Sequence, residues 1–123
     1  MLHGPTNVAE LFFKALTNQT SAFVSLPIND VEGWEPEGSM AANAHGQPGR
    51  AVVIGREPLL EGYCATNGIP HVLLYGNPGV TYTLEQRTNL SLGTWQEIGT
   101  VPMTNLVRDA HTGVPGTGFI RAH

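Results

Sequence analysis

Hydrophobic and polar residues alternate in short runs along much of the chain, and most runs end at a glycine or a proline. In residues 80–85, the apolar side chains of Val80, Tyr82 and Leu84 alternate with polar ones. Alternation with period two is typical of a strand that turns one face to a core. Similar patterns predict strands at 21–28, 51–54, 58–65, 71–75, 95–101, 105–108 and 119–122. Short strands separated by turn signals predict an all-β, antiparallel β-sandwich.

Residues 8–16 fit two patterns. Asn7 followed three positions later by Glu10 is similar to a helix cap, and the apolar residues after it fall on one helical face. The alternation around Leu11 and Phe13 fits a strand equally well. We favour the strand because the rest of the chain is β-rich, and the helix stays the alternative.

Residues 29–50 are predicted to form a long irregular loop rich in glycine, proline and carboxylates. A stretch of this length without regular structure is uncommon in a compact domain unless it is functional or mobile. It contains Trp34, flanked by Glu32 and Glu35. An aromatic ring can stack on a sugar while carboxylates accept its hydroxyls, so these three residues are the candidate ligand-binding site. The alternative is that Trp34 folds back over the core.

Other conspicuous residues are predicted to be structural. Gly76-Asn77-Pro78-Gly79 predicts a tight turn, after which Tyr82 and Leu84 face the core. Trp95 is predicted to pack between the sheets, so that its truncation costs about 3–5 kcal/mol. Cys64, the only cysteine, is predicted to be a small buried hydrophobe.

The composition argues against several functions. The formal charge is −4 and the six Lys and Arg residues are scattered, so a nucleic-acid partner is not expected. No apolar run approaches the roughly 20 residues of a membrane span. The five histidines have no zinc-site spacing and the acidic residues of 29–50 match no calcium loop, so we expect no metal and no cofactor. No nucleophile motif is present, so we expect no enzyme; a small hydrolase built on the acidic loop is the weakest alternative.

The C-terminal half resembles a known repeated module. The ordered motifs are Gly76-Asn77-Pro78-Gly79 leading to Tyr82-Thr83-Leu84-Glu85, then Thr88-Asn89-Leu90, Trp95, and Phe119-Ile120-Arg121 near the end. Together they are similar to the C-terminal β-sandwich module of large secreted proteins from Verrucomicrobia and Planctomycetes, over about residues 58–123. Ile120 departs from the tyrosine usual at that position.

The front half, about residues 8–56, is similar to the last strands of a cohesin-like sandwich. The two resemblances together imply an immunoglobulin-like or cohesin-like fold, with segments 1–56 and 57–123 as two domains or one fold unit. They imply an extracellular or cell-surface location and a non-catalytic role in adhesion or polysaccharide contact. They imply no ligand residues.

A sandwich that lacks its first strands would expose a sheet edge. Leu11, Phe12 and Phe13 lie on that candidate edge and are the predicted interface residues. The partner would be another surface protein, or a second copy in a homo-oligomer. The alternative function is therefore a structural subunit assembled through exposed strands.

Overall fold

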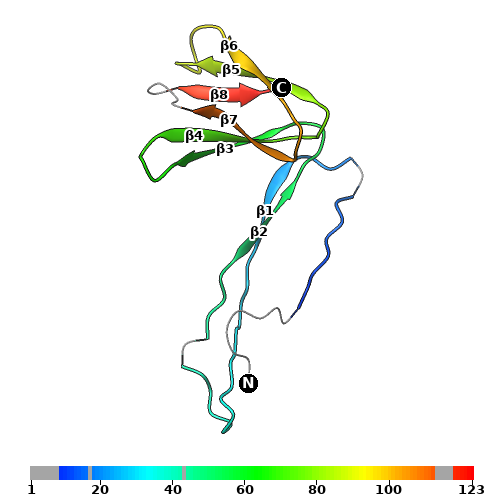
Figure 1. Cartoon of the computed structure of the whole chain (residues 1–123), viewed down its shortest axis with the longest axis vertical. Helices are drawn as coiled ribbons and strands as arrows, with labels where there is room; N and C mark the ends of the chain where they lie inside the picture. Colours follow the sequence, from blue (N-terminus) through cyan, green and yellow to red (C-terminus); the bar gives the residue numbers. More distant parts are fainter. Residues whose placement is uncertain (1–8, 17, 43, 113–117) are drawn as a thin grey trace. The chain divides into compact units, whose positions relative to one another are not determined.

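The computed structural model of the chain describes residues 9–16, 18–42, 44–112 and 118–123. Every regular element in these ranges is a β-strand, so the predicted all-β fold is confirmed. The eight strands are β1 (Ala22–Leu26), β2 (Gly49–Val53), β3 (Leu59–Cys64), β4 (Pro70–Tyr75), β5 (Thr81–Arg87), β6 (Gln96–Pro102), β7 (Val107–Thr112) and β8 (Phe119–Ala122) (Figure 1).

The chain divides into two compact units. Unit 1 contains Met1–Thr17 and Phe23–Val52, and unit 2 contains Asn18–Ala22 and Val53–His123. Residues 18–22 belong with unit 2 because the Ser21 hydroxyl accepts a hydrogen bond from the Gly55 N–H at 2.8 Å and donates one to the Glu57 carbonyl. The domain boundary at residue 56 stays a prediction.

Unit 1 is built on a two-stranded sheet of β1 and β2. The segment that follows β1 and the segment that precedes β2 run alongside each other (Figure 1). We call residues 23–52 the arm. These two segments approach closely at Gly46, where an added Cβ would lie 2.6 Å from Ile28 Cγ2. The predicted irregular loop therefore folds back on itself like a hairpin, with few backbone hydrogen bonds between its two sides.

A tight turn closes the arm. Glu35 N–H bonds to the Ser39 carbonyl at 2.8 Å, Gly38 N–H bonds to the Glu35 carbonyl at 2.9 Å, and Gly38 has φ +86°. Three loop residues with a proline first and a positive-φ glycine last form a common hairpin connection. Pro36-Glu37-Gly38 carried this signal in the sequence.

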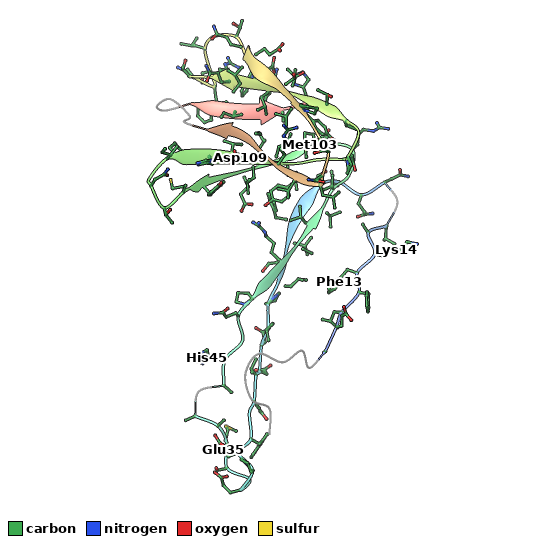
Figure 2. All side chains as sticks on the ribbon, viewed as in Figure 1. Phe13, Lys14, Glu35, His45, Met103 and Asp109 are labelled. Carbon is green, nitrogen blue, oxygen red and sulfur yellow. The ribbon has the colours of Figure 1, made fainter. Side chains whose placement is uncertain are left out.

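Residues 9–16 form neither a strand nor a helix, so the predicted strand is absent over these residues. Val8, at the start of that prediction, lies outside the described residues. A strand needs a neighbour to hydrogen-bond its backbone, and no ladder in the described chain includes this segment. All of its described side chains are exposed. Figure 2 shows Phe13 and Lys14 on this segment.

Unit 2 consists of two three-stranded antiparallel sheets, ordered β3-β4-β7 and β6-β5-β8. The buried residues that join them are Leu74 from β4, Tyr82 and Leu84 from β5, Val101 from β6, and Met103 just after it. Because one core lies between the two sheets, unit 2 is a small β-sandwich. The predicted core positions of Tyr82 and Leu84 are confirmed, with 4% and 2% of each residue exposed.

The turn at residues 76–79 forms as predicted and packs on the core. Val80 N–H bonds to the Asn77 carbonyl at 3.2 Å, and Gly79 has φ +86°. Asn77 N–H also bonds to the Tyr82 hydroxyl at 3.1 Å. A Cβ on Gly76 would lie 2.4 Å from Tyr82 Cε2, so this glycine makes room for a core ring.

Candidate functional site

The end of the arm presents Trp34 to solvent. Trp34 pairs with Met40 in an isolated antiparallel bridge, and the two residues are 63% and 60% exposed. Trp34 therefore does not fold back over a core. Glu32 and Glu35 are exposed beside it, so the fold places all three predicted site residues next to the turn (Figure 2 labels Glu35 there). Their ligand-binding role stays a prediction.

The arm as a whole lacks a hydrophobic interior. None of its described residues is buried. The large apolar side chains left exposed are Phe23, Val24, Ile28, Val31, Trp34 and Met40. An isolated two-stranded hairpin is marginally stable in water, because it needs further strands or another surface to cover an apolar face.

The predicted interface residues are also exposed. Leu11, Phe12 and Phe13 are 76%, 87% and 67% exposed, and Leu16 is 76% exposed. Exposed apolar side chains are common singly, but a contiguous group marks an interaction site. Unit 1 therefore carries two segments whose large apolar side chains stay exposed, although the Arg50 guanidinium carbon lies 4.7 Å from the centroid of the Phe23 ring.

The outer face of the sheet β3-β4-β7 carries a cluster that sequence reasoning missed. Tyr63 lies opposite His71 in the strand register, and their rings stack with centroids 5.0 Å apart. His71 Nδ1 lies 2.7 Å from Asp109 Oδ2, and the Tyr63 hydroxyl donates to the same oxygen at 3.4 Å. The alternation in 58–65 and 71–75 could have placed Tyr63 and His71 on one face, but the pairing with β7 needed the tertiary structure.

The surroundings of Tyr63 disfavour its ionised form. Partial removal of the phenol from water, then the negative charge of Asp109 and the hydrogen bond to it, raise the pKa of Tyr63 above its ordinary value of 10.0. The neutral phenol is therefore retained as a hydrogen-bond donor over a wider pH range.

The outer face of the other sheet, β6-β5-β8, carries Trp95. Trp95 is only partly buried and does not belong to the core cluster, so its predicted position between the sheets is wrong. The guanidinium carbons of Arg121 and Arg87 lie 4.4 Å and 5.9 Å from its ring centroid. Arg121 also pairs with Glu85 at 2.6 Å. Trp95 immediately precedes β6. The register of β5 and β6 shifts between Leu84 and Glu85, and this bulge changes which side chains at the start of β6 face the core.

Cys64 is exposed, which corrects its predicted burial. It lines a cavity of about 570 Å³ with Leu60, Gly62, Val72 and Ile120. Among the described residues, no group of three His, Cys, Asp or Glu side chains could hold a metal ion. In the same part of the chain, no helix has the length and apolar character needed to cross a membrane.

The described residues thus offer an exposed apolar surface in unit 1 and two outer faces with polar and aromatic side chains in unit 2. Comparison of the chain with family models, with curated proteins and with solved structures found no match.

Proposed function

We propose that this chain is a non-catalytic extracellular binding and adhesion module that associates with a second copy of itself through unit 1. The observation that carries the proposal is the absence of any buried residue in the described part of unit 1, beside several large exposed apolar side chains. Burial of such a side chain is worth about 1.5–3 kcal/mol, so pairing of two arms would gain a substantial free energy. The extracellular location rests on the resemblance of residues 58–123.

Two features support a second copy as the partner. A two-fold axis brings the same edge of each copy together, and an antiparallel edge can then add strands to the β1–β2 sheet. The charge along the arm is also uneven. Asp30, Glu32, Glu35 and Glu37 lie toward the turn, whereas Arg50 lies in β2 at the other end. Antiparallel alignment places the acidic end of one arm beside the basic end of the other.

Oligomeric state in solution tests this proposal. We expect the wild type to sediment as a dimer at micromolar concentration. Ile28→Glu and Phe12→Glu should each shift it to a monomer, because a buried carboxylate without a partner is costly. Leu90→Glu in unit 2 is the matched control, because Leu90 and Ile28 are both 55% exposed. A wild type that stays monomeric, or a dimer unchanged by both unit 1 variants, would contradict the proposal.

A second candidate function is saccharide contact at Trp34, with Glu32 and Glu35 accepting hydroxyls. It is supported by the 63% exposure of Trp34 beside a defined turn. If it holds, a glycan array identifies a ligand for the wild type, and Trp34→Ala removes that binding without changing the melting temperature. Loss of binding together with a large fall in melting temperature would indicate a structural role instead.

A further inference from the structure

A groove of about 210 Å³, lined in part by Leu92 and Gly93, lies where β5 ends and the chain turns back toward β6. Polar side chains from both sides line it: Gln86, Arg87, Thr88, Thr94 and Gln96. Thr94 and Gln96 flank Trp95 in the chain, and Arg87 lies over the Trp95 ring. The groove therefore combines one cation with amides and hydroxyls, next to an aromatic side chain.

Arg87 differs from its neighbour Arg121 because no carboxylate of the described residues forms an ion pair with it. The ion pairs recorded among the described residues of this face join Glu85 to Arg121 at 2.6 Å and to His123 at 3.6 Å, and do not include Arg87. Arg87 Nε donates a long hydrogen bond of 3.4 Å to the Leu92 carbonyl. This contact and the Trp95 ring position the guanidinium, and its terminal N–H groups have no recorded acceptor in the described chain.

We propose that this groove binds one uronate unit of an acidic polysaccharide. The sugar carboxylate would accept a pair of hydrogen bonds from the terminal N–H groups of Arg87, whose planar fork matches a carboxylate. The sugar hydroxyls would pair with the amides of Gln86 and Gln96, which can both donate and accept. Pockets for drug-sized ligands begin at roughly 300 Å³, so this smaller groove suits a single unit of a longer chain.

The charge of the whole chain indicates how this groove would hold the uronate. The whole chain has a net charge of −4, so it does not attract polyanions through its overall field. Capture of an anion must therefore rest on a local contact. A planar carboxylate accepts both bonds in the plane of the guanidinium, which suits a cation that already lies against an aromatic ring. The groove lies within unit 2, so this proposal is independent of association through unit 1.

Isothermal titration with oligogalacturonate tests the site, with dextran oligosaccharide as the neutral control and dextran sulfate as the sulfated control. We expect the wild type to bind oligogalacturonate and not dextran. Arg87→Gln should weaken that binding at least about tenfold, because a charge-assisted pair is lost. Arg87→Lys keeps the charge but loses the fork, so we expect an intermediate affinity.

Arg56→Gln is the charge-matched control, because Arg56 is an exposed residue of unit 2 outside the groove. It should bind oligogalacturonate as the wild type does. Absence of binding by the wild type, equal weakening by Arg56→Gln and Arg87→Gln, or tighter binding of dextran sulfate than of oligogalacturonate would each overturn the proposal. If Arg87→Gln fails to fold, wild-type affinity in Arg87→Lys overturns the fork geometry by itself.

Discussion

His71 Nδ1 on β4 lies 2.7 Å from Asp109 Oδ2 on β7. The contact joins the two strands where their register shifts between Val72 and Leu73. Asp109 also accepts the hydroxyl hydrogen of Tyr63 from β3, so one carboxylate connects all three strands of the sheet on its outer face.

This contact predicts the titration of Tyr63. Asp109→Asn should lower the pKa of Tyr63 toward the ordinary 10.0, because the negative charge that opposes ionisation is removed. It should stay somewhat raised, since partial desolvation of the phenol persists. Tyrosinate absorbance of each protein, after subtraction of the matching Tyr63→Phe spectrum, measures the shift. An unchanged titration would show that Asp109 does not influence the phenol.

The same raised pKa predicts the pH dependence of stability. The folded state holds the Tyr63 proton more tightly than the unfolded state, so this contribution is fully present below pH 10.0. It is lost as the pH rises through the folded-state pKa. Chemical denaturation at pH values below and above 10.0 should show a smaller alkaline loss of stability in Tyr63→Phe than in the wild type. Equal losses would contradict the prediction.

The core predicts unequal effects of two truncations. Leu74 has 0% exposure and belongs to the core cluster of unit 2, so Leu74→Ala should lower the free energy of unfolding by about 2–5 kcal/mol. Trp95 is only partly buried outside that cluster, so Trp95→Ala should lower it by less, about 1 kcal/mol. Urea denaturation of both variants compares them. A larger loss for Trp95→Ala would restore the interpretation that its ring packs in the core.

Two glycines of one turn should respond to alanine for different reasons. A Cβ on Gly76 would lie 2.4 Å from Tyr82 Cε2, so Gly76→Ala must displace a core ring and should cost about 1–3 kcal/mol. Gly79 has open space but a φ of +86°, so Gly79→Ala should cost about 1 kcal/mol through backbone strain alone. Thermal unfolding measures both losses. The near-ultraviolet circular dichroism of tyrosine should change in Gly76→Ala only.

The tryptophans should differ in their access to solvent. Trp34 is 63% exposed, whereas Trp95 is partly buried against two guanidinium groups. Acrylamide should therefore quench the fluorescence of Trp95→Phe, which retains Trp34, more strongly than that of Trp34→Phe. If two arms pair, quenching of Trp34 should also fall as protein concentration rises. Quenching that is equal in the two variants would contradict the arrangement.

The sequence alone determined the all-β class, most strand positions of unit 2, the turn at residues 76–79 and the burial of Tyr82 and Leu84. Those features depend on local patterns, because alternation and turn chemistry act within a few residues.

Three other predictions were wrong because they depended on which segments become neighbours: the strand at 8–16, the burial of Cys64 and the core position of Trp95. Only the tertiary structure decided these, because pairing and burial are set by partner strands far along the chain. It also brought Asp109 beside Tyr63 and His71, and placed Arg87 without a recorded carboxylate beside the groove. No spacing in the sequence encodes either relationship, since each joins residues from separate strands or turns.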